Sequence, residues 1–273
     1  MDNKIIETRL GFENLGKIYD KADNVTIYKE VIEHVDCYWF KNNKKLNTDK
    51  IVIYLHGGGF VLGSIQSHQA LVSHLAKHLS LPVLFVEYSL APEKAYPNAI
   101  DDIMSVYEHL LRQYPKTDIV FMGDSAGGGL AISAISKINK NGMRPPIFMV
   151  LFSPQVDLSC TNDSFVTNAK SDPVLTKKFV QDFSALYING SDLSEVNPIK
   201  TMFGLFPPTL ILVGSGEILL DDSKSIYKKI ISQQVNAKLS IYENQTHVWI
   251  LKNIHTEESK QAIKEMQDFI SQD

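Results

Sequence analysis

The sequence predicts an α/β fold in which a mostly parallel central sheet lies between helices. Short apolar runs alternate with amphipathic segments along the 273 residues. Each run is five to seven residues long and is apolar at both alternating positions, which is typical of parallel strands buried on both faces. No internal repeat or Gly/Ser-rich linker divides the chain, so residues 1–273 are expected to form a single domain.

Six apolar runs are the expected strands of this sheet. They are residues 51–55, 82–88, 118–122, 146–152, 209–213 and 237–242. The earlier stretch 25–40 alternates less cleanly and is expected to form an antiparallel hairpin at an edge of the sheet. Helical spacing of apolar side chains is found in residues 71–79, 103–111 and 130–138. Strands that alternate with helices predict right-handed crossovers, with helices on both faces.

Residues 157–208 break this alternation, because they contain no strong buried strand. Within them, residues 175–188 have helical spacing and are surrounded by turn-forming residues. Long insertions between two strands usually serve a function, so we expect an inserted helical cap over a site. Phe179, Phe183 and Tyr187 either line a pocket under this cap or dock its helix, and their spacing favours neither.

Composition and charge exclude several classes of protein. The chain has 27 basic and 31 acidic residues and a net charge of −4, which gives no attraction to nucleic acid. Its apolar runs are far too short for a membrane span, and the N-terminus lacks a secretory pattern. Only Cys37 and Cys160 are present, so a disulfide framework is excluded and a cytoplasmic location is expected. The sequence is compatible with a monomer and with a homodimer.

The segment Gly123-Asp-Ser-Ala-Gly127 matches G-x-S-x-G and is the first candidate for catalytic chemistry. It follows the expected strand 118–122 and precedes a helical stretch. A strand-to-helix turn must be sharp to lift a serine hydroxyl clear of the sheet, and flanking glycines remove side chains that would collide there. This placement favours Ser125 as a nucleophile over a serine that only caps a helix.

Three consecutive glycines, Gly57, Gly58 and Gly59, follow the expected strand 51–55. Glycines are entropically costly to order, so such a run indicates close approach of the backbone to a ligand. In acyl transfer, backbone N–H groups bind the oxyanion of the tetrahedral intermediate. A dinucleotide-binding G-x-G-x-x-G is disfavoured, because Leu62 occupies the position of its third glycine.

The motifs His56-Gly-Gly-Gly-Phe60, Glu87-Tyr-Ser-Leu-Ala-Pro-Glu93 and Gly123-Asp-Ser-Ala-Gly-Gly128 together resemble the hormone-sensitive lipase family of α/β-hydrolases. That family consists mostly of carboxylesterases and lipases. The resemblance implies the α/β-hydrolase fold, a Ser–His–acid triad and an oxyanion hole built from the glycine motif and the amide of Ala126. It also implies a cap of residues 157–208 with a contribution from residues 1–24, and no cofactor.

The histidine and the acid of such a triad follow the serine in chain order. His247 and His255 are the two histidines after Ser125. His247 comes just after the expected strand 237–242, where a parallel sheet presents its loops. His255 lies in a polar stretch and is expected at the surface, so His247 is the predicted base.

Glu217 is the predicted triad acid, because it lies in the loop after the expected strand 209–213. The family usually has an aspartate followed by Pro-Leu at this register, whereas this sequence has Glu217 followed by Ile218. Asp221 and Asp222 are the alternatives. They fall at the start of the next helix, where a negative charge is favourable without any catalytic role.

His74 and His78 have the i, i+4 spacing of metal ligands, but no H-E-x-x-H motif accompanies them, so no metal is expected. The predicted function is that of a serine carboxylesterase acting on a small acyl ester of short to medium chain length. An amide-type hydrolase, such as an arylformamidase or a small peptidase, would use the same residues and is the alternative. A non-catalytic receptor on this fold would be expected to lack a triad member.

Overall fold

The computed structural model describes residues 3–233 and 235–271, so the ends of the predicted domain and of its N-terminal contribution lie outside the described residues. The strands are β1 (Val25–Ile32), β2 (Val35–Asn42), β3 (Lys50–Leu55), β4 (Val83–Val86), β5 (Asp118–Asp124), β6 (Phe148–Phe152), β7 (Thr209–Gly214) and β8 (Ala237–Tyr242). The long helices are α1 (Asn3–Glu13), α2 (Ile65–Leu79), α3 (Asn98–Gln113), α4 (Ala126–Lys140), α6 (Lys177–Ile188), α9 (Leu220–Ile231) and α11 (Glu257–Ile270). The short ones are η1 (Asn14–Lys17), α5 (Ser164–Thr167), α7 (Leu193–Val196), α8 (Pro198–Thr201) and α10 (Trp249–Lys252).

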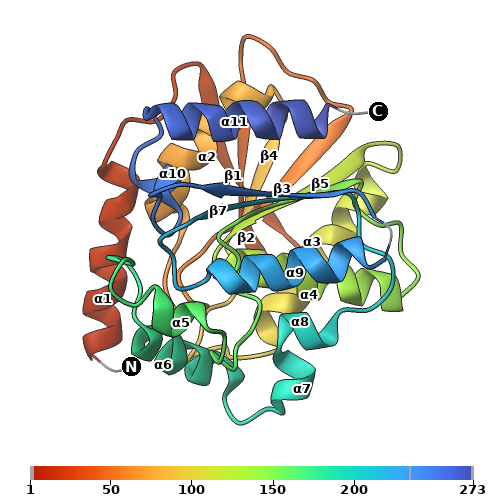
Figure 1. Ribbon diagram of the computed structural model, residues 1–273. Helices are drawn as coiled ribbons and strands as arrows, with labels where there is room; N and C mark the ends of the chain where they lie inside the picture. The colour runs from red at the N-terminus through yellow and green to blue at the C-terminus, as the bar shows by residue number, and fades with distance from the viewer. Residues whose placement is uncertain (1–2, 234, 272–273) are drawn as a thin grey trace.

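The strands of the described residues form one eight-stranded sheet with the order β1-β2-β4-β3-β5-β6-β7-β8. The hairpin of β1 and β2 lies at one edge and pairs antiparallel with β4, and all other neighbours are parallel. The predicted fold class is therefore confirmed, and the hairpin is where the sequence placed it. Helices cover both faces, with α2, α10 and α11 on one and α3, α4 and α9 on the other (Figure 1).

The two faces of the sheet pack into two separate hydrophobic clusters. Along β3, Ile53 and Leu55 belong to the cluster under α3 and α4, whereas Val52 and Tyr54 belong to the cluster under α2 and α11. This is the alternation of a strand buried on both faces. The prediction is wrong for β8, where Ile241 is 40% exposed, because an edge strand has a neighbour on one side only.

Helix α2 begins six residues before the periodic stretch that predicted it. Its start is set by Ser64, whose hydroxyl accepts a hydrogen bond from the amide of Gln66, while the Ser67 hydroxyl accepts from the amide of Ser64. This capping box satisfies amides that no helical carbonyl reaches. The local polar pattern, rather than the leucine spacing, decides where the helix begins.

The segment between β6 and β7 contains α5, α6, α7 and α8, so the helical character predicted for residues 175–188 is confirmed. In Figure 1, α1 lies beside α5 and α6, although the two regions are far apart in the sequence. None of the described helices combines the length and the apolar character needed to cross a membrane.

Candidate active site

The loops after β5, β7 and β8 bring Ser125, Glu217 and His247 into contact. The carboxyl ends of parallel strands meet at one edge of a sheet, so residues far apart in sequence converge there. Nε2 of His247 lies 2.9 Å from Oγ of Ser125, and Nδ1 of His247 lies 3.0 Å from Oε2 of Glu217. Ser125 and His247 are each 7% exposed and Glu217 is fully buried. One chain of hydrogen bonds therefore links the three residues that the sequence analysis selected.

Ser125 occupies a sharp turn between β5 and α4, with φ of 51° and ψ of −120°. A non-glycine residue with positive φ is strained, and the surroundings must hold it there. The amide of Ser125 donates to the carbonyl of Phe152, 2.8 Å away. A Cβ on Gly127 would lie 2.1 Å from the carbonyl oxygen of Leu55, which is why only glycine fits next to the turn.

Both oxygens of Glu217 are held by hydrogen bonds. Oε2 faces His247, and Oε1 accepts from the Ser153 hydroxyl at 2.7 Å and from the Gly214 amide at 2.6 Å. Ser153 lies directly after β6 and carried no signal in the sequence, because it belongs to no motif. Its role in the site follows only from the position of β6 between β5 and β7.

Asp221 and Asp222 do not contact His247. Both lie in the first turn of α9, as expected. They do more than place a negative charge at the start of that helix, because both also accept hydrogen bonds from the segment after β6. Asp222 is fully buried and accepts from the amides of Val156 and Asp157 at 2.8 and 2.9 Å, and Asp221 accepts from the amide of Ser164. Burial raises the pKa of Asp222 to about 7, against the opposing effect of these N–H donors. The two aspartates anchor the start of the segment between β6 and β7.

The glycine motif lies against the turn that carries Ser125. Gly58 and Gly59 line the cavity beside Ser125, and their φ values are 117° and 63°. Within residues 3–233 and 235–271, the backbone amides of Gly58, Gly59 and Ala126 have no hydrogen-bond acceptor. Gly57 instead packs against Asp124, the residue before Ser125. An added Cβ on Gly57 would lie 2.2 Å from Oδ2 of Asp124, so only glycine fits at this position.

Asp124 is a buried charged residue whose position the sequence analysis did not interpret. Its Oδ1 accepts a hydrogen bond from the Tyr54 hydroxyl at 2.8 Å and lies 3.5 Å from Nε2 of His68. Burial alone would raise the pKa of Asp124, but His68 and Tyr54 outweigh this effect and hold the pKa below its ordinary value. The carboxylate therefore stays charged next to Ser125, and Gly57 lies close against it.

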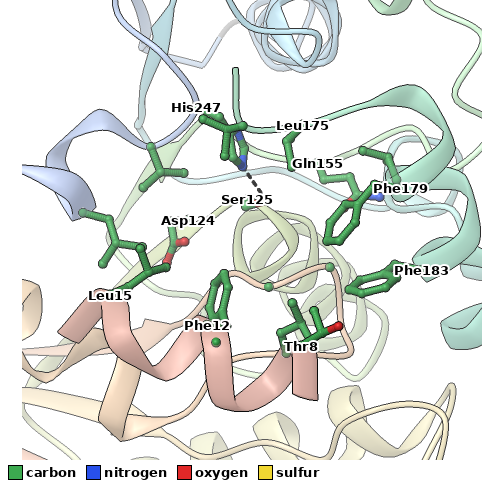
Figure 2. A pocket seen from close by; sticks show the side chains of 18 of the residues that line it. Thr8, Phe12, Leu15, Asp124, Ser125, Gln155, Leu175, Phe179, Phe183 and His247 are labelled. Atoms are coloured by element: carbon green, nitrogen blue, oxygen red, sulfur yellow. Dashed lines mark hydrogen bonds between the residues drawn. The ribbon is translucent and has the colours of Figure 1, made fainter. Parts of the chain in front are cut away.

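A cavity of about 480 Å³ opens above Ser125 and is lined mainly by apolar side chains. Figure 2 shows Thr8 and Phe12 of α1 on one side of Ser125, and Phe179 and Phe183 of α6 on another. Tyr187 has a different environment, because its ring stacks on Phe60 with the centroids 4.1 Å apart. The aromatic residues of α6 are thus divided: two line the cavity and the third docks the helix.

His74 and His78 both lie on α2. No group of three or more His, Cys, Asp or Glu side chains suited to a metal ion occurs in the described part of the chain. His74 is nearly buried, and its Nε2 lies 3.1 Å from the carbonyl oxygen of Asp20. His74 therefore contributes to the packing of α2, whereas His78 is exposed.

Comparison with known proteins identifies the family of this chain. A family model described as the alpha/beta hydrolase fold matches residues 52–251. The chain is also 36% identical, over 225 residues, to an esterase of Acinetobacter venetianus, and the match covers 81% of this chain and 74% of that protein. The chain belongs to the alpha/beta hydrolase family.

A further relative and a solved structure are also similar to this hydrolase. An acetyl-hydrolase of Streptomyces hygroscopicus is 30% identical over 256 residues, which cover 93% of this chain and 83% of that protein. The crystal structure of an esterase from the bacterial hormone-sensitive lipase family superposes with a TM-score of 0.93 at 31% identity, covering 97% of this chain and 90% of that one. The resemblance predicted from the three motifs is confirmed.

Proposed function

We propose that this hydrolase cleaves short- to medium-chain acyl esters through a covalent intermediate on Ser125. The observation that carries the proposal is the buried chain of contacts from Ser125 through His247 to Glu217 at the floor of an apolar cavity. The chain is a carboxylic ester hydrolase by family, and the names of its relatives, esterase and acetyl-hydrolase, support hydrolysis of acyl esters.

In the proposed mechanism, the Ser125 hydroxyl attacks the ester carbonyl while Nε2 of His247 accepts its proton. Glu217 accepts the hydrogen bond from Nδ1–H, fixes the tautomer of the ring and stabilises the imidazolium. The tetrahedral intermediate collapses when His247 donates the proton to the departing alcohol, which leaves an acyl-serine. Water then attacks the acyl-serine with His247 again as the base, and the carboxylic acid is released.

The amides of Gly58, Gly59 and Ala126 are the proposed oxyanion hole, and Gly57 shapes the loop that presents them. Support comes from the absence of any acceptor for the three amides within the described residues. Donors that are already oriented where charge develops stabilise a transition state without reorganisation. Gly58 and Gly59 have positive φ values, which glycine adopts without strain and which let the loop approach the cavity.

The helices between β6 and β7, together with α1, are the proposed cap of the acyl site. Phe179 and Phe183 from α6 and Phe12 from α1 enclose a cavity whose volume is in the range typical of small-molecule sites. We expect this enclosure to limit the acyl chain. With 4-nitrophenyl esters from acetate to palmitate, kcat/KM should be greatest for a short or medium chain and fall steeply for the long ones.

Labelling with an organophosphonate tests the nucleophile directly. Intact mass and peptide mapping should show a single adduct, on Ser125, and Ser125→Ala should be neither labelled nor active. Full activity in Ser125→Ala would overturn the proposal. Parallel assays of matched ester and anilide substrates separate an esterase from an amide-type hydrolase, because the latter would turn over the anilide at a comparable rate.

A further inference from the structure

A lysine lies in the wall of the otherwise apolar cavity. Lys252 is the last residue of α10, five positions after His247, and it lines the same cavity as Ser125. Among the described residues that line this cavity, it is the only lysine or arginine. A cationic side chain at this position is not needed for the chemistry proposed for Ser125, His247 and Glu217.

Lys252 is half-buried, and its ammonium group has no hydrogen bond or ion pair with any of residues 3–233 and 235–271. The acidic groups whose charges act on it are Asp172 and Glu217. Their oxygens are already engaged. Oδ1 of Asp172 accepts from the amides of Val174 and Leu175, Oδ2 accepts from the amide of Ile218, and both oxygens of Glu217 are held within the site.

The ammonium group therefore loses part of its hydration without gaining a partner in return. Burial lowers the pKa of Lys252, and the charges of Asp172 and Glu217 act in the opposite direction without cancelling this effect. A partly buried cation without a counter-ion is unfavourable, and an anion entering the cavity would offset that cost. The other charge in the cavity wall, Asp124, is compensated within the protein by Tyr54 and His68.

We propose that Lys252 makes this hydrolase prefer esters that carry a negative charge, such as a carboxylate, on the acyl or the alcohol part. The proposal rests on the esterase function proposed above and names the class of substrate for the same site. Attraction between opposite charges is strongest where water is excluded, as in an apolar cavity. The neutral remainder of such a substrate would contact Phe12, Phe179 and Phe183, while its charged end would lie toward α10.

A different role for Lys252 is to balance the charges of Asp172 and Glu217, and so to hold the acid loop in place. The two roles predict different results. A balancing role would change the hydrolysis of every ester by the same factor, since it acts through Glu217 and His247. A substrate-binding role would change the rates for charged esters relative to those for neutral ones.

The test compares kcat/KM for two matched pairs of esters with the full-length protein. In the first pair, 4-nitrophenyl hemisuccinate carries the charge on the acyl part and 4-nitrophenyl butyrate is neutral. In the second, 3-carboxyphenyl butyrate carries it on the alcohol part and phenyl butyrate is neutral. The variants are Lys252→Met, Lys252→Glu and Lys252→Arg. Lys260→Met is the control, because Lys260 is exposed on α11 and pairs with Glu257.

In at least one pair, we expect the ratio of charged to neutral kcat/KM to fall about tenfold in Lys252→Met and further in Lys252→Glu. The ratio should be retained in Lys252→Arg and Lys260→Met. In the wild type, the ratio should decrease as the salt concentration rises, because salt screens the charge of Lys252. Ratios that stay unchanged in Lys252→Met and Lys252→Glu for both pairs would overturn this proposal alone. If none of the four esters is hydrolysed in a reaction that depends on Ser125, both the esterase function and this proposal are overturned.

Discussion

The hydroxyl of Ser153 donates a 2.7 Å hydrogen bond to Oε1 of Glu217, the carboxylate oxygen that does not face His247. The same hydroxyl accepts from the amide of Val248 at 3.2 Å. One side chain at the end of β6 thus contacts both the loop that carries the acid and the loop that carries the histidine. This position makes Ser153 a positioning residue for Glu217 and His247.

Replacing Ser153 with alanine should lower kcat more than it changes KM. The Glu217 carboxylate would lose a fixed donor, and the Val248 amide would lose its acceptor, with a cost of roughly 1–3 kcal/mol in unfolding free energy. Ser73→Ala is the matched control, because the Ser73 hydroxyl bridges Ala70 and Ala22 away from the site. Urea unfolding and steady-state kinetics on both variants check this. Equal kcat in the two variants would leave Ser153 with a structural role only.

Glu217→Gln should reduce kcat by a factor on the order of 10³–10⁴, as is found when a triad acid loses its charge but keeps its shape. The amide cannot fix the tautomer of His247 or stabilise its protonated form. Asp221→Asn is the control, because Asp221 lies four residues after Glu217, in the first turn of α9, and contacts Ser164 and Lys224 instead. A thousandfold loss in Asp221→Asn, with Glu217→Gln near wild type, would contradict the assignment of the acid.

Asp222→Asn should destabilise the protein by roughly 1–3 kcal/mol, because a buried acceptor of several N–H groups is weakened. The folded-state pKa of about 7 lies above the unfolded value of roughly 3.9, so the unfolded state loses its proton first as the pH rises. The wild type consequently loses stability between pH ~4 and pH ~7 through this group, and the asparagine variant does not.

The difference in unfolding free energy between wild type and Asp222→Asn should therefore be larger at about pH 5 than at about pH 8. Urea titrations at the two pH values measure it. A difference that grows toward pH 8 would mean that the hydrogen bonds from Val156 and Asp157 outweigh burial and keep the carboxylate ionised in the folded state.

Gly59→Ala should reduce kcat by a factor on the order of 10²–10³, the loss found when an oxyanion donor is displaced. A Cβ at this position would lie 2.8 Å from the ring of Phe183 and would force the loop or the ring to move. Gly142→Ala is the control for backbone strain, since Gly142 has the same φ of 63° and nothing within 4 Å of an added Cβ. Both variants should lose about 1 kcal/mol of stability, and only Gly59→Ala should lose activity.

The fold class and the positions of most strands were predictable because buried parallel strands leave continuous apolar runs in the sequence. Ser125 was predictable because the turn between β5 and α4 needs glycine on both sides, a steric demand that the motif records locally. His247 and Glu217 followed from chain order and from their places after β8 and β7. In each case a local constraint on the backbone is written into neighbouring residues.

The contacts of Ser153 and Asp222 could not be predicted in this way. Ser153 meets Glu217 because β6 lies beside β7, and Asp222 meets Val156 because α9 packs against the segment that leaves β6. Such contacts join residues about sixty positions apart, and nothing in either neighbourhood marks the partner.

The sequence by itself determined most elements, their order along the chain and which residues are candidates for the catalytic groups, because propensity, burial pattern and turn sterics act over a few residues. Only the tertiary structure decided that Ser153 contacts Glu217, which aromatic side chains of α6 line the cavity and that Lys252 stands in its wall without a partner. These properties depend on distances between chain segments. Such distances are set when the two hydrophobic clusters pack against the sheet, a process that involves the whole chain at once.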